Sequence, residues 1–196
     1  MKPKRKIIIG VDEAGRGPWA GPVVAASVKI KSDLEHQQYY DQIRDSKKLS
    51  EKKRQQLLDN ITNDSNIEYY YSVISNEIID DINILEATKA AMVNCLNQYN
   101  SQHDEILIDG NQTVDFRSPV KAVIGGDDLI FEISAASIIA KQIRDNLMIE
   151  YDNQYPEYGF KKHKGYGTKL HREALLKYGP CPIHRISFKP IKNLIS

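Results

Sequence analysis

Short apolar runs alternate along the chain with longer segments whose apolar positions recur at helical spacing. Runs rich in β-branched or aromatic residues predict five strands, at residues 7–12, 23–30, 68–75, 105–110 and 120–124. The helical repeat predicts helices at residues 51–61, 84–99 and 132–147, with a further helix at residues 168–178. Ser50 is the predicted N-cap of the first helix, and the glycine-, aromatic- and lysine-rich residues 155–167 predict a loop.

The order of these elements predicts an α/β fold with a mixed five-stranded sheet flanked by helices. Strands 7–12 and 23–30 follow each other closely and are expected to pair antiparallel. A helix separates strand 105–110 from strand 68–75, so strands 7–12 and 105–110 can lie parallel and adjacent. We expect residues 1–152 to form the main domain and residues 153–196 to form a basic loop-helix segment packed on it.

Carboxylates stand at the carboxyl ends of three predicted strands. Asp12 and Glu13 follow the first strand, Asp109 ends the fourth, and Asp127 or Asp128 follows the fifth. Ligand sites of α/β sheets lie at this edge, so we expect the acids to meet there. Strict alternation would turn Glu13 away from Asp12, which predicts that the strand ends or bulges at Asp12.

Four clustered carboxylates without a cation would repel one another, so the pattern indicates a metal site. No closely spaced histidine pair or thiolate accompanies the acids, which favours the hard cations Mg²⁺ or Mn²⁺. Two such ions could support phosphodiester hydrolysis. Each acid also has a simpler interpretation, because Asp127 or Asp128 could cap a helix and Asp109-Gly110 could form a turn.

The overall net charge of +1 conceals an uneven distribution. Residues 153–196 carry +7 and the first 152 residues carry −6. Three of the five histidines (His163, His171 and His184) also lie in this basic segment. An acidic body beside a basic segment fits a cation centre next to a surface for a polyanion, although solvated helix faces would give the same balance.

No apolar run reaches the length of a membrane span, and the apolar residues after the basic N-terminus are too few for a signal peptide. We therefore expect a cytoplasmic protein without a membrane partner. Cys95 and Cys181 have no metal-ligand spacing and are interpreted as a core thiol and a loop thiol.

Several short motifs follow one another along the chain. The most specific runs from Gly10 to Pro18 and includes Asp12-Glu13 and Gly15-Arg16-Gly17. The others are Asp45-Ser46-Lys47-Lys48-Leu49, Ile108-Asp109-Gly110-Asn111, the segment 133–141, His163-Lys164-Gly165-Tyr166-Gly167-Thr168 and His184-Arg185 with Ser187-Phe188. In this order, these motifs resemble the ribonuclease HII family. The chain departs from the family pattern at Gly125, where a lysine is common, and at Trp19 and Ile186.

The resemblance implies a ribonuclease H-like fold with a small C-terminal helical extension. It implies an endonuclease that cuts the RNA strand of RNA–DNA hybrids and cuts 5′ of single ribonucleotides in duplex DNA. We expect the protein to act as a monomer. The site residues that it implies are metal-binding acids and substrate contacts: Asp12, Glu13, Asp109 and Asp127, and Gly15, Arg16, Gly17 and Tyr166. From the charges alone, Lys47 and Lys164 are expected to hold phosphates electrostatically, although a solvent-exposed loop would also explain Lys47.

Two alternatives stay open from the residues themselves. A different nuclease on the same fold would share the acids without needing Gly15-Arg16-Gly17 or Tyr166. A non-catalytic nucleic-acid-binding module would keep the basic residues and could lose the acids.

Overall fold

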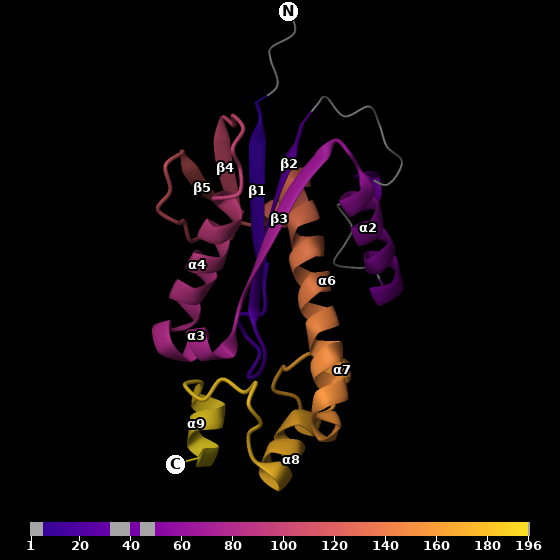
Figure 1. The fold of residues 1–196 in the computed structure, drawn as a ribbon, viewed down its shortest axis with the longest axis vertical. Helices are drawn as coiled ribbons and strands as arrows, with labels where there is room; N and C mark the ends of the chain where they lie inside the picture. The colour runs from indigo at the N-terminus through magenta and orange to yellow at the C-terminus, as the bar shows by residue number, and fades with distance from the viewer. Residues whose placement is uncertain (1–5, 32–39, 44–49, 196) are drawn as a thin grey trace, which may run out of the picture.

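The computed structural model describes residues 6–31, 40–43 and 50–195. Its centre is a five-stranded sheet in the order β3-β2-β1-β4-β5 (Figure 1). The strands are β1 (Ile8–Ala14), β2 (Val23–Ile30), β3 (Ile67–Ile74), β4 (Glu105–Asp109) and β5 (Val120–Val123). β2 pairs antiparallel with β1 and β3, whereas β4 pairs parallel with β1 and β5. The predicted mixed five-stranded sheet is confirmed.

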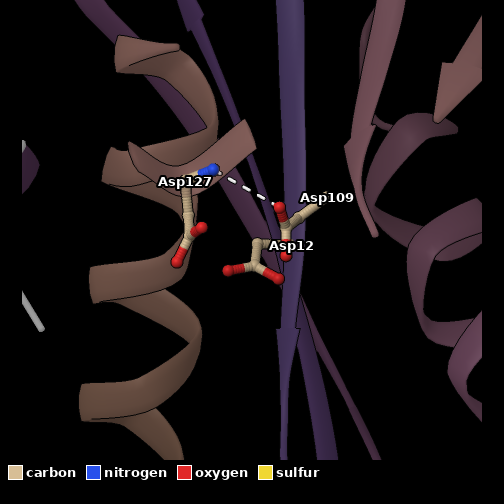
Figure 2. A group of neighbouring side chains, drawn as sticks. All are labelled: Asp12, Asp109 and Asp127. Atoms are coloured by element: carbon tan, nitrogen blue, oxygen red, sulfur yellow. Dashed lines mark hydrogen bonds between the residues drawn. The ribbon is translucent and has the colours of Figure 1, made fainter. Parts of the chain in front are cut away.

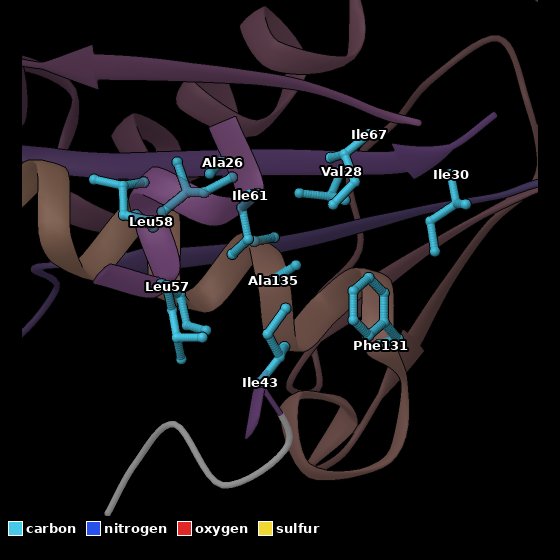
Figure 3. Close-up of a cluster of buried hydrophobic side chains, with 14 of the residues drawn as sticks. Ala26, Val28, Ile30, Ile43, Leu57, Leu58, Ile61, Ile67, Phe131 and Ala135 are labelled. Carbon is cyan, nitrogen blue, oxygen red and sulfur yellow. The ribbon is translucent and has the colours of Figure 1, made fainter. Parts of the chain in front are cut away.

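Helices cover both faces of this sheet. The long helix α6 (Phe131–Gln154) and helix α2 (Glu51–Asn63) pack on one face, and α4 (Ile84–Leu96) packs on the other (Figure 1). Figure 3 shows the first of these cores, where β2 side chains meet apolar residues of α2 and α6. Because successive β2 side chains alternate between the two cores, β2 is buried along its whole length.

The remaining helices are shorter. Between the strands lie α1 (Tyr40–Ile43) and α3 (Asn76–Ile82), and α5 (Gly126–Leu129) joins β5 to α6. After α6 come η2 (Pro156–Tyr158), α7 (Phe160–His163), α8 (Lys169–Tyr178) and α9 (Lys189–Ile195). The C-terminal elements gather at one end of α6, where a third apolar cluster joins Ala20 and Met148 to Phe160 and Leu175 (Figure 1). The proposed boundary after residue 152 falls inside α6, and the division into two units stays a prediction.

Some local predictions are confirmed and others are wrong. The Ser50 side chain caps α2 by accepting from the Lys53 amide, and Cys95 is buried in the core. The predicted loop 155–167 instead contains η2 and α7, which are too short to show a helical repeat. Helices α3 and α9 have seven residues each and were not predicted for the same reason. In the part of the chain that the structure describes, none of the helices is long and apolar enough to cross a bilayer.

Candidate active site

The close approach of α6 to β1 determines where the acids meet. A Cβ atom at Gly10 would lie 2.3 Å from the Glu132 carbonyl carbon, so only glycine allows this contact. The contact places the start of α6 directly on β1. It thereby places α5, which immediately precedes α6 and carries Asp127, beside the end of that strand.

Three aspartates converge at this point from β1, β4 and α5 (Figure 2). Each of Asp12, Asp109 and Asp127 offers a carboxylate oxygen, and these oxygens lie within 4.8 Å of one another. The Asp127 amide donates to Asp109 Oδ1 at 3.3 Å, which ties α5 to the end of β4. Asp12 and Asp127 are each only 7% exposed, so the three carboxylates form a largely buried cluster.

Glu13 reaches the same region without a break in the strand. β1 continues to Ala14 in regular pairing with β2, so the predicted end or bulge at Asp12 is wrong. Two clefts meet at Glu13. One is also lined by Arg16 and the other is also lined by Asp109. Glu13 Oε1 lies 3.3 Å from Arg16 Nη1, so Glu13 stands between the aspartate cluster and the following loop.

The electrostatics of the acids favour a bound cation. Burial, followed by the neighbouring charge of Glu13, raises the pKa of Asp12 to about 8. Burial also raises the pKa of Glu13 above its ordinary value, while the Arg16 guanidinium opposes that rise. A donor set made of carboxylate oxygens suits Mg²⁺ or Mn²⁺, and a divalent ion would stabilise the charged forms that burial disfavours. The residues present therefore fit a hard-metal site.

A cleft of about 430 Å³ lies next to the cluster and joins two segments that are far apart in sequence. Its wall includes Glu13, the loop Gly15-Arg16-Gly17 and Tyr166. A Cβ atom at Gly17 would lie 3.6 Å from Tyr166 Cε1, so the ring lies directly over this glycine. The structure thus brings together the glycine loop and the tyrosine that the sequence singled out.

Four polar residues that the sequence analysis did not assign to the site also line this cleft: Arg54, Ser137, Lys141 and Arg144. A hydrogen bond from Ser137 lowers the pKa of Asp12 and partly offsets the effect of burial. Arg144 follows Ala136 and Ala140 at intervals of four on the buried side of α6. An arginine in such an apolar stripe is the sequence signal that could have identified it.

The other predicted positions lie as follows. Lys47 is outside the described residues. The Lys164 ammonium donates to the Lys161 carbonyl at 2.6 Å and lies 3.6 Å from Glu51 Oε1. Asp128 is exposed, and the N-cap position of α5 is Gly125 in a left-handed conformation with φ of 67°. Neither Asp127 nor Asp128 is therefore a helix cap.

Comparisons with known proteins agree with this geometry. The family model described as Ribonuclease HII matches residues 9–191. A ribonuclease HII from Endomicrobium trichonymphae is 50% identical over 190 residues, covering 96% of this chain and 88% of that protein. The ribonuclease HII of Francisella tularensis subsp. novicida is 49% identical over 189 residues, covering 96% of this chain and 100% of that protein.

The fold has solved counterparts as well. The ribonuclease H2 from Pyrococcus horikoshii OT3 matches with a TM-score of 0.78 and 27% identity, and 96% of each chain is covered. The sequence comparison and the structure comparison therefore both match ribonuclease H proteins over almost the whole chain. The chain belongs to the ribonuclease HII family and is a ribonuclease H, a hydrolase.

Proposed function

We propose that this enzyme is an endonuclease that cuts the RNA strand of RNA–DNA hybrids and cuts 5′ of single ribonucleotides in duplex DNA. It leaves 5′-phosphate and 3′-hydroxyl ends. The observation that carries the proposal is the convergence of Asp12, Asp109 and Asp127 within 4.8 Å, beside a cleft lined by the glycine loop. We further propose that it acts as a cytoplasmic monomer.

The three aspartates, with Glu13, are the proposed ligands of two Mg²⁺ or Mn²⁺ ions. When bound, such ions activate a water and stabilise the departing 3′ oxygen of a phosphodiester. The ionised acids would hold the positive charge of the ions at this site. Arg16 orients Glu13 through the 3.3 Å contact between Nη1 and Oε1. The hydrogen bond from the Asp127 amide on α5 to Asp109 at the end of β4 holds these two acids in place before the substrate binds.

The glycine loop and Tyr166 are the proposed readers of the ribonucleotide. A protein distinguishes RNA from DNA through the 2′-hydroxyl and the helix shape. Backbone groups at Gly15-Arg16-Gly17 can approach this hydroxyl closely, because two of the three residues have no side chain. Tyr166 is 46% exposed and its ring lies over Gly17, where it can pack on the adjoining sugar.

A cleavage assay tests the proposal directly. Purified enzyme with Mg²⁺ is given an RNA–DNA hybrid, an all-DNA duplex and a DNA duplex with one ribonucleotide. We expect cleavage of the first and third substrates only, with 3′-hydroxyl ends. Asp127→Asn should abolish cleavage, whereas Asp128→Asn, the matched control at the exposed neighbour, should retain it. Cleavage of the all-DNA duplex, or equal losses in the two variants, would contradict the proposal.

A further inference from the structure

Arg185 is fully buried, although the charge count places it in the basic segment expected to face a polyanion. It follows a short turn after α8, and its guanidinium points into the loop formed by residues 15–22. Its five hydrogen bonds all end on backbone carbonyls of that loop. They run from Nε to Gly21 at 2.9 Å, from Nη1 to Arg16 at 3.1 Å and Pro18 at 2.9 Å, and from Nη2 to Gly15 at 2.6 Å and Pro22 at 3.0 Å.

A guanidinium has five N–H donors, so Arg185 uses its whole donor capacity on one loop. A loop of glycines and prolines forms few backbone hydrogen bonds of its own, and its buried carbonyls need donors from elsewhere. Arg185 supplies these donors in a fixed planar arrangement. The relative positions of the five carbonyls, including those of Gly15 and Arg16, are thereby set by one side chain.

The segment that carries Arg185 is itself anchored to α3. Asp80 accepts from the amides of Ile186 and Ser187 at 2.9 Å each, and Asn76 Nδ2 donates to the His184 carbonyl at 3.3 Å. The Arg185 amide also donates to the Trp19 carbonyl at 2.8 Å. The backbone that carries the Arg185 guanidinium is therefore held in place by α3 and by Trp19.

Arg144 connects the same loop to the tyrosine. It donates to the carbonyls of Pro22 at 2.9 Å and Ala20 at 3.1 Å, and to that of Lys164 at 2.9 Å. The Trp19 amide donates to the Gly165 carbonyl at 2.8 Å. The loop held by Arg185 and the segment that presents Tyr166 thus share one hydrogen-bonded framework.

We propose that Arg185 is a positioning residue, which sets the placement of the Gly15-Arg16-Gly17 backbone against the aspartates and Tyr166 through its five carbonyl contacts. It does not touch substrate. This inference rests on the proposed function, because that function assigns the loop to the substrate. A loop displaced by about 1 Å would misplace the scissile phosphate and lower kcat by on the order of 10²-fold.

The test uses the full chain, Mg²⁺ and a DNA duplex with one ribonucleotide. Arg185→Lys keeps the charge but places all its donors on one nitrogen, which cannot span five carbonyls. Asp80→Asn keeps Arg185 and removes one acceptor from its anchor, so it gives a milder displacement in a protein that folds. Arg172→Lys on the exposed face of α8 is the matched control. For each variant kcat, KM, the melting temperature and the stoichiometry of Mn²⁺ binding are measured.

We expect Arg185→Lys to lose about 10²-fold in kcat, and Asp80→Asn to lose less in the same direction. KM and Mn²⁺ stoichiometry should stay at the wild-type values, because phosphate contacts and the aspartates lie elsewhere. Wild-type kcat in both variants would overturn the inference. The inference would also be overturned if kcat and the number of bound Mn²⁺ ions fell by the same factor, because that result would mean that part of the protein is unfolded. If Asp127→Asn is active in the same assay, the proposed function itself fails.

Discussion

In the metal-free protein, the contribution of Asp12 to the free energy of unfolding should fall as the pH rises. Its pKa is about 8 in the folded chain, against 3.8 for the ordinary side chain, chiefly because it is buried. Because the pKa of Asp12 is higher in the folded than in the unfolded chain, the folded state binds the proton more tightly. The stabilisation is complete below pH 4 and is lost as the pH rises toward 8.

The size of the effect follows from the two pKa values. Between them, each pH unit removes about 1.4 kcal/mol from the Asp12 contribution to the free energy of unfolding, so the step from pH 5 to pH 7 removes about 3 kcal/mol of that contribution. Asp12→Asn removes the titration and keeps an oxygen that can accept from the Glu13 amide, as Asp12 Oδ1 does at 2.7 Å. The stability of the variant relative to the wild type should therefore rise by about 3 kcal/mol from pH 5 to pH 7, and the variant should be the more stable of the two at pH 7.

Urea unfolding in the presence of a chelator, from pH 5 to pH 8, measures this difference. Asp128→Asn is the matched control and should follow the wild-type profile, since Asp128 is exposed. Saturating Mn²⁺ should reverse the order of stability, because it binds the ionised aspartate and stabilises only the wild type fully. Parallel profiles of Asp12→Asn and wild type without metal would refute this account of the buried acid.

Two further predictions concern the C-terminal segment. Tyr166→Ala should depress cleavage at a single ribonucleotide by about 10²-fold at every salt concentration. Lys164→Ala should act mainly at high salt, where electrostatic binding is weak, and cleavage rescued at low salt in both variants would show that Tyr166 only packs. Burial lowers the pKa values of His171 and His184 to about 4, so both stabilise the fold above pH 6.5, and the free energy of unfolding should fall as the pH drops toward 4. In urea titrations, His184→Gln should reduce this fall in the free energy of unfolding between pH 6.5 and pH 4. An unchanged fall would contradict the attribution to His184.

The acid positions could be predicted because strong local patterns carry them. Asp12 and Asp109 follow apolar runs whose parallel pairing is the normal outcome of a helical crossover. The placement of Glu13 could not be predicted in the same way. The need for Glu13 to face the same side as Asp12 predicts a break at Asp12, yet β1 pairs regularly through Ala14, because β2 continues beside it. Pairing with a neighbouring strand is a tertiary effect that local residue preferences do not contain.

The hydrogen bonds from Arg185 and Arg144 that hold the glycine loop could not be predicted from the sequence. Arg185 counts as one more positive charge in a basic segment, and nothing local indicates that its side chain is buried. Its partners are backbone carbonyls, which every residue has, so no partner residue type marks the contact. Arg144 offered a weak signal because it interrupts the apolar side of α6. Contacts between side chains and a distant backbone are therefore where sequence patterns give the least information.

Anomalous diffraction from crystals soaked in Mn²⁺ tests the central claim most directly. Asp12, Asp109 and Asp127 already offer oxygens within 4.8 Å of one another, so little movement is needed to bind an ion. We predict an anomalous peak between these three carboxylates in the wild type and its loss in Asp109→Asn. A peak elsewhere, or one that persists unchanged in Asp109→Asn, would contradict the assignment of the aspartate cluster as the metal centre.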